Sequence, residues 1–92
     1  MTDPKIVNVR KKLDKLDMKL LLIIKKRTNL VNEVIKLKKK KEIVDKKRIN
    51  FILQKIKKKS IFLKIDPAIT VSIWKEMIRS FIKYEYKNFK NK

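Results

Sequence analysis

A single arginine interrupts an apolar row in the first third of the sequence. Arg27 falls in a row with seven-residue spacing, whose other members are Leu13, Leu20 and Val34. A cation in such a row costs free energy unless an anion neutralises it. The pattern leaves three interpretations open: a salt bridge to Glu33 or Asp17, a side chain that reaches back to water, or a cation that holds a bound anion.

Lys38 follows Arg27 by eleven residues, and eleven steps of about 100° return to within about 20° of the same helix face. Their Cα atoms would lie roughly 16 Å apart on one helix. Two long side chains at this distance could converge on a small ligand. Taken alone, Lys38 is typical of a solvated lysine, because it begins the run 38–41.

Two more charges lie on apolar faces further along the chain. Arg48 is four residues from both Val44 and Ile52, and Glu85 continues the row Trp74, Ile78 and Phe81. A carboxyl group on an apolar face is either paired with a cation or held protonated. Arg48 and Glu85 could pair with each other or with lysines, and Asp45 alone is typical of a helix cap. Together, these mainly cationic charges predict a buried pocket for a small dianion.

The elements that must position these charges are helices. The sequence has no Gly and only two Pro, and both Asp3-Pro4 and Asp66-Pro67 are typical of a helix start. The periodicity predicts an all-α chain of three helices, over about 4–40, 45–58 and 67–89, with a loop at 60–65. The 92 residues predict a single domain.

The predicted first helix is long for so small a chain. About 36 residues would extend about 54 Å, whereas a compact monomer of this size has a radius of gyration of about 12 Å. Its apolar stripe consists of Val9, Leu13, Leu16, Leu20, Ile23, Leu30, Val34 and Leu37. This stripe needs cover from another chain, most simply an identical one about a two-fold axis. An intertwined homodimer is the expected assembly.

The composition excludes several kinds of chemistry. No Cys and no His are present, which removes thiolate metal sites and the usual general base, and we expect no metal and no cofactor. No apolar run is long enough for a membrane span or typical of an export signal, so a cytoplasmic protein without a membrane partner is the default expectation.

The net charge of +19 also suggests a basic helical dimer that binds nucleic acid. Only four of the 28 cations are Arg, although the planar guanidinium suits phosphates and base edges better than Lys does. Few aromatic residues lie among the cations to stack on bases. We therefore expect no specific nucleic-acid partner, and any binding to be weak and salt-sensitive.

The order of several short motifs resembles the all-α chorismate mutases over nearly the whole chain. These motifs are Val9-Arg10, Leu13-Asp14, Leu16-Asp17, Arg27, Glu33-Val34, Lys36-Leu37-Lys38, Val44-Asp45-Lys46-Lys47-Arg48, which is like the family's V-x-D-x-x-R, Ile73-Trp74-Lys75-Glu76-Met77-Ile78 and Glu85. The resemblance implies a three-helix subunit in an intertwined dimer. It also implies an isomerase of aromatic amino acid biosynthesis, in the shikimate pathway, that converts chorismate to prephenate.

The resemblance implies roles for the charged residues already described. Arg27 would grip one substrate carboxylate, and Arg10 would reach the other from the partner subunit. Lys38 would donate to the ether oxygen, and Glu85, where the family usually has Gln, would donate to it when protonated. The remaining residues of the implied substrate-binding set are Arg48, Asp45, Ile49 and Phe81.

The implied reaction is a pericyclic [3,3] rearrangement, which needs no nucleophile. Catalysis would come from holding the flexible arm of chorismate over the ring and from fixed cations that face the ether oxygen. Because an ionised carboxylate cannot donate a proton, we expect activity to fall as pH rises and Glu85 loses its proton.

Ile49 departs from the family pattern, because the residue after the arginine of V-x-D-x-x-R is usually a Glu that binds the ring hydroxyl. An apolar residue at this point also occurs in the related isochorismate-pyruvate lyases. These enzymes share the fold and form salicylate and pyruvate. The lyase reaction is therefore the alternative activity that the resemblance implies.

Overall fold

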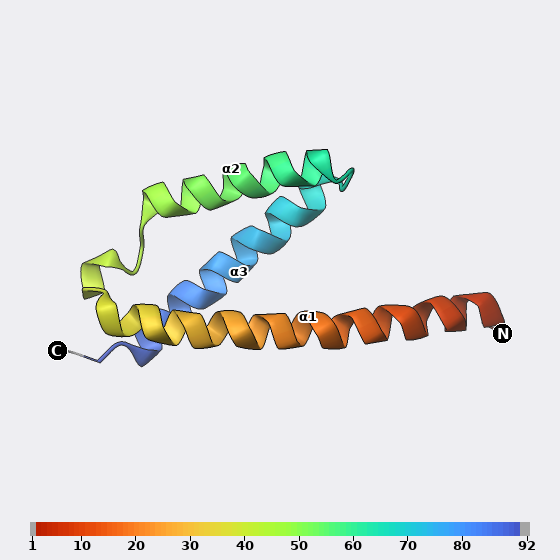
Figure 1. Ribbon diagram of the computed structural model, residues 1–92, viewed down its shortest axis with the longest axis horizontal. Helices are drawn as coiled ribbons and strands as arrows, with labels where there is room; N and C mark the ends of the chain where they lie inside the picture. Colours follow the sequence, from red (N-terminus) through yellow and green to blue (C-terminus); the bar gives the residue numbers. More distant parts are fainter. Residues whose placement is uncertain (1, 91–92) are drawn as a thin grey trace. The chain divides into compact units, whose positions relative to one another are not determined.

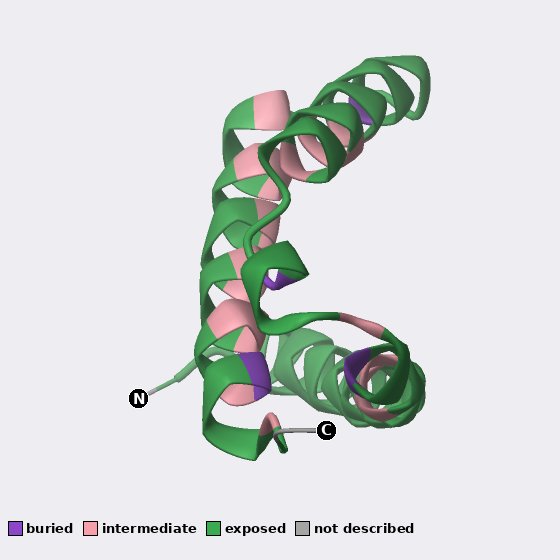
Figure 2. Cartoon of the chain, turned by 90° about the vertical axis from the view of Figure 1, so that its left-hand side faces the viewer, coloured by how far each residue is buried: buried purple, intermediate pink, exposed green. Residues whose placement is uncertain are grey.

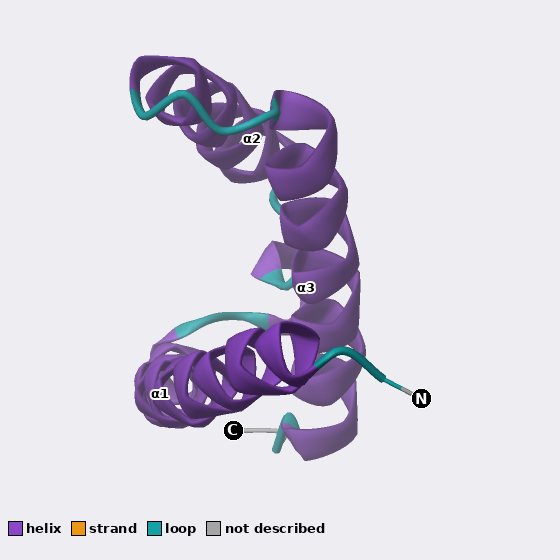
Figure 3. Ribbon diagram, turned by 90° about the vertical axis from the view of Figure 1, so that its right-hand side faces the viewer, coloured by secondary structure: helices purple, strands orange, loops and turns teal. Residues whose placement is uncertain are grey.

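The structure is a computed structural model in which residues 2–90 are described. Three α-helices and one short 3-10 turn follow in the order α1 (Pro4–Leu37), η1 (Lys40–Glu42), α2 (Lys46–Phe62) and α3 (Pro67–Asn88) (Figure 1). Between residues 2 and 90 there are helices and loops but no strands (Figure 3). The predicted all-α class with three helices is confirmed. The chain divides into two compact units, Met1–Asn32 and Glu33–Lys92.

Helix α1 begins where the sequence predicts. The Asp3 carboxylate accepts a hydrogen bond from the backbone N–H of Lys5 at 2.8 Å, and Pro4 occupies the first helical position. The helix ends at Leu37, three residues before the predicted end. Lys39 has an extended backbone (φ −83°, ψ 154°), and its N–H donates to the carboxylate of Glu42 at 2.7 Å. This bond starts a 3-10 turn in place of further α-helix.

Helix α2 has the predicted start and a later end. The Asp45 carboxylate accepts from the backbone N–H of Arg48 at 3.0 Å, so Asp45 is the helix cap. The predicted end at Lys58 was wrong, because the helix continues to Phe62. Ser60, predicted to open a loop, is a buried helical residue instead.

The turn after α2 has a lysine at the position where a helix end usually has glycine. Lys64 has a φ of 60°, in the left-handed region that glycine usually occupies. The backbone N–H of Ile65 donates to the carbonyl oxygen of Ser60 at 2.8 Å, and that of Lys64 to Ile61 at 3.1 Å. These two bonds form a Schellman motif that caps the helix. The bonds offset the conformational cost at Lys64, which is about 1–2 kcal/mol for a residue with a Cβ.

Helix α3 packs against α2. It starts at the predicted Asp66-Pro67, where the Asp66 carboxylate accepts from the N–H of Ala68 at 2.9 Å, and it ends one residue before the predicted Phe89. The hydroxyls of Ser60 and Thr70 lie 2.6 Å apart and join the two helices. Because the Ser60 hydroxyl donates to the carbonyl of Ile56, also at 2.6 Å, Thr70 is the donor in the hydroxyl pair.

A single chain buries little apolar surface. Ile35 and Ile43 are the only buried hydrophobic residues among those described, and every residue of α1 before Arg27 is exposed (Figure 2). The predicted stripe of α1 is exposed too: Leu13 is 52%, Leu20 54% and Leu30 61% accessible. Within residues 2–90, no helix is both long and apolar enough to cross a membrane.

Candidate functional site

A partly buried ion pair joins the end of α1 to the end of α3. Lys38 Nζ lies 3.1 Å from Glu85 Oε1, and donates a hydrogen bond to it. The Lys38 side chain is 25% exposed and that of Glu85 only 9%. A second ion pair, Arg79 with Glu76 at 3.6 Å, lies on the surface, with side chains that are 68% and 66% exposed. The Lys38–Glu85 pair is therefore far better shielded from water than the Arg79–Glu76 pair.

Local structure places both members of this pair. The backbone N–H of Lys38 still donates to the Val34 carbonyl at 3.0 Å, so Lys38 continues the α1 spiral by one residue. Glu85 lies near the end of α3, four residues after Phe81, on the row that the sequence predicted to face inward. The sequence left a paired or a protonated carboxyl open. The structure shows the paired form, with Lys38 rather than Arg48 as the partner.

Phe81 gives this end of α3 an aromatic surface. Its ring is half-buried and meets the ring of Tyr84 edge to face, with the centroids 6.3 Å apart and the planes at 79°. Phe81 and Glu85 lie one helical turn apart. An apolar ring and a carboxyl group therefore border the same stretch of α3.

The candidates on α2 lie at its first turn. Asp45 is exposed and caps the helix, and Ile49 is half-buried. Arg48 is exposed, and its guanidinium carbon lies 5.6 Å from the centroid of the Phe51 ring. This is a cation–π contact, in which Arg48 rests on a surface ring.

The remaining two candidates belong to the unit Met1–Asn32. Arg10 is exposed on the second turn of α1. Arg27 is half-buried, whereas the residues before it in α1 are all exposed. Arg27, the cation in the apolar row, is thus the first residue of α1 that is partly buried.

The chemistry available at the Lys38–Glu85 pair is proton donation and charge stabilisation. An ammonium group has three N–H donors, so Lys38 can bind Glu85 and still offer donors to a ligand. Within residues 2–90, no three acidic residues come together as metal ligands would.

Sequence reasoning missed the role of Ser60. The half-buried residues of α2 are Ile49, Ile52, Leu53 and Ile56, and Ser60 follows Ile56 by four residues on the same face. This spacing could have predicted that Ser60 is a buried residue of the helix, because a small hydroxyl residue that continues an apolar row can donate a hydrogen bond to the preceding helical turn.

The chain matches one model of a known protein family. Residues 9–86 match the model described as chorismate mutase type II. The matched range contains every candidate residue from Arg10 to Glu85 and most of the chain. The chain belongs to the chorismate mutase type II family. Comparison with curated proteins and with solved structures found no match.

Proposed function

We propose that this protein is a chorismate mutase that converts chorismate to prephenate as a homodimer. The observation that carries the proposal is the shielded Lys38–Glu85 pair, inside a chain that matches the family over residues 9–86. An ammonium group held in a partly dry environment interacts with a developing negative charge more strongly than one in water does.

Each charged candidate has a proposed role. Lys38 donates to the ether oxygen as the C–O bond breaks and the new C–C bond forms. Arg27 binds one carboxylate of the substrate, and Arg10 of a second copy binds the other. A guanidinium suits this task because it binds a carboxylate through two parallel hydrogen bonds.

Glu85 has a proposed role that depends on its proton. Glu85 forms an ion pair with Lys38, so both side chains lie at the same end of α3. In its protonated form the Glu85 carboxyl would be a second donor to the ether oxygen. Asp45 and Arg48 at the first turn of α2, with Ile49 and Phe81, complete the proposed substrate-binding set.

The exposed stripe of α1 supports the proposed dimer. Its apolar residues recur at spacings of three and four from Val9 to Leu37, with one interruption at Arg27, and each is more than a third exposed in the single chain. A contiguous apolar surface of this length marks an interface. Two copies related by a two-fold axis present the same stripe to each other.

A substrate assay distinguishes the proposed activity from its alternative. The second candidate is an isochorismate-pyruvate lyase, favoured by the half-buried, apolar Ile49 at the first turn of α2. Purified protein incubated with chorismate is expected to form prephenate. Salicylate and pyruvate from isochorismate would assign the lyase instead, and no product from either compound would refute both activities.

The proposed role of Glu85 as a hydrogen-bond donor predicts that glutamine can replace it and alanine cannot. Glu85→Gln keeps an N–H donor at this position, so kcat is expected to stay at or above the wild-type value. Glu85→Ala has no donor, so kcat is expected to fall about tenfold or more. Initial rates with chorismate measure both variants. Glu76→Ala, on the exposed face of α3, is the matched control and should keep the wild-type rate. A Glu85→Ala enzyme as active as this control would contradict the role.

A further inference from the structure

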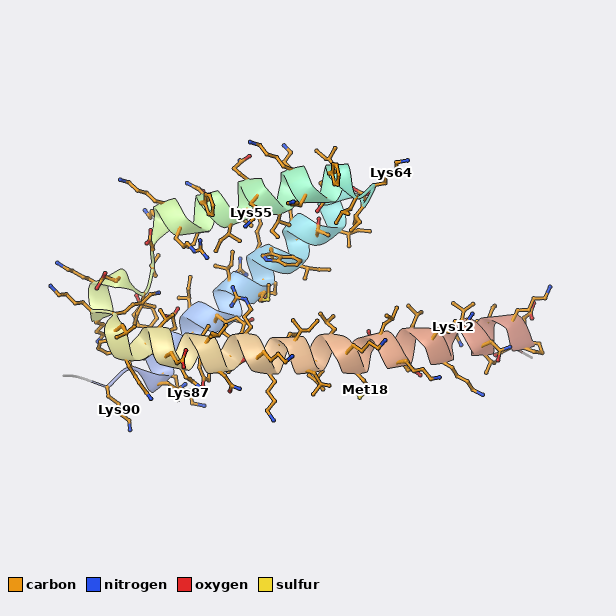
Figure 4. All side chains as sticks on the ribbon, viewed as in Figure 1. Lys12, Met18, Lys55, Lys64, Lys87 and Lys90 are labelled. Carbon is orange, nitrogen blue, oxygen red and sulfur yellow. The ribbon has the colours of Figure 1, made fainter. Side chains whose placement is uncertain are left out.

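The face of α2 that points away from α3 carries an ordered row of exposed side chains. Phe51, Lys55, Lys58 and Phe62 follow one another at steps of four, three and four residues, which places them on one side of the helix. Figure 4 labels one member of this row, Lys55. The buried and half-buried residues of α2 lie on the opposite side. Phe51 is 57% exposed and Phe62 79%, although phenylalanine is among the residues most often buried in proteins.

These side chains line an open hollow at the surface. Phe51 and Phe62 line it together with Gln54, Lys55, Lys58 and Lys59, and its volume is about 510 Å³. The two rings are eleven residues apart, which is about 16 Å along the helix axis. The hollow is therefore an elongated apolar surface whose middle is cationic.

The charge of α2 is entirely positive. Its seventeen residues include seven cations and no Asp or Glu, so the lysines beside the hollow have no acidic neighbour within their own helix. Arg48 covers one face of the Phe51 ring, which extends the cationic surface past that end of the row. A partner that neutralises this face must bring several carboxylates or phosphates.

We propose that this α2 face, the row from Phe51 to Phe62, binds an acidic amphipathic helix of another protein. A helix laid along α2 meets side chains at the same steps of three and four, so its apolar residues can reach both rings while its carboxylates meet Lys55, Lys58 and Lys59. The proposal concerns the outer side of α2 and does not depend on the proposed enzymatic activity.

Charge and spacing favour this occupant over two others. A second copy seated on this face would have to meet its lysines with carboxylates, and the chain has only nine Asp and Glu against 28 Lys and Arg. Single-stranded nucleic acid binds proteins by stacking successive bases on aromatic rings. Two rings about 16 Å apart with lysines between them do not form a continuous stacking platform.

A binding experiment with a designed peptide tests the proposal. The probe is a fluorescein-labelled helical peptide of about 20 residues, with leucines at steps of four, three and four and glutamates on both flanks. Fluorescence anisotropy with the full chain is expected to show saturable binding. The double variant Phe51→Ala/Phe62→Ala should weaken the affinity about tenfold or more, because it removes both apolar anchors. Circular dichroism is expected to stay unchanged, since both rings are exposed.

Two double variants of equal net charge distinguish the effect of this face on peptide binding from the effect of the overall charge. Lys55→Glu/Lys58→Glu and Lys11→Glu/Lys25→Glu change the net charge equally, and all four lysines are exposed. The first pair should weaken peptide binding about tenfold or more and the second less than about threefold. Equal weakening by both pairs would overturn the proposal. So would a wild-type chain that binds oligouridylate but not the peptide, or a change of oligomeric state in the phenylalanine variant, which would assign the face to a second copy.

Discussion

Replacing Arg27 with alanine is expected to lower kcat/KM for chorismate by at least about a hundredfold, the usual effect of removing one preorganised donor from a charged site. Arg27 is the cation in the apolar row of α1, and it is half-buried while the preceding residues of the helix are exposed. Alanine suits helices well, so the variant should remain helical. Steady-state kinetics and circular dichroism on the same preparation measure both expectations.

Arg79→Ala is the matched control, because it makes the same chemical change at an arginine that is 68% exposed and pairs with Glu76 on the surface. It should keep activity within about twofold, as surface substitutions usually cost no more than about 0.5 kcal/mol. An Arg27→Ala enzyme as active as the control would refute the role of Arg27. Mixing Arg10→Ala and Arg27→Ala chains should restore part of the activity, because one site of each mixed dimer then has both arginines.

Leu20→Glu is expected to abolish the dimer and to destabilise the fold by several kcal/mol. Leu20 lies in the middle of the α1 stripe and is 54% exposed in the single chain. In a monomer this would be a surface substitution with a small effect. In the proposed dimer it places two carboxylates at the two-fold interface. Analytical ultracentrifugation and thermal melts report the assembly and the stability.

Leu22→Glu is the control for this prediction. Leu22 is 61% exposed and lies two residues on, about 200° around the helix, so it faces away from the stripe. The control should remain dimeric and melt near the wild-type temperature. The proposed interface would be contradicted if Leu20→Glu behaved like Leu22→Glu.

The helix starts were predictable from the sequence, and the helix ends were not. Each start is set by a local signal, an aspartate whose side chain accepts a backbone N–H, and the structure confirms Asp3, Asp45 and Asp66 in this role. The helix ends depend on hydrogen bonds made without glycine or proline, which are the residues that usually mark the end of a helix in a sequence. Glu42 reaches back to the N–H of Lys39, and Lys64 adopts a left-handed backbone in a chain that has no glycine.

The charge pattern predicted the buried end of α3 well. Glu85 continued an apolar row and is buried, because a four-residue step keeps it on the side of Phe81. Its partner could not be chosen from the sequence, since 28 cations were available and spacing within one helix says nothing about contacts between helices. The surface contact of Arg48 with Phe51 was missed for a related reason. A three-residue step places these side chains together, but the row of Val44 and Ile52 suggested an inward arginine.

The scarcity of buried apolar residues in one chain ties folding to protein concentration. With only Ile35 and Ile43 buried among the described hydrophobic residues, a lone chain has little to offset its loss of conformational freedom. In the proposed dimer, folding and association are then a single bimolecular equilibrium governed by mass action. Dilution would unfold the protein, and the rate of its synthesis in a cell would set the fraction of chains that are folded.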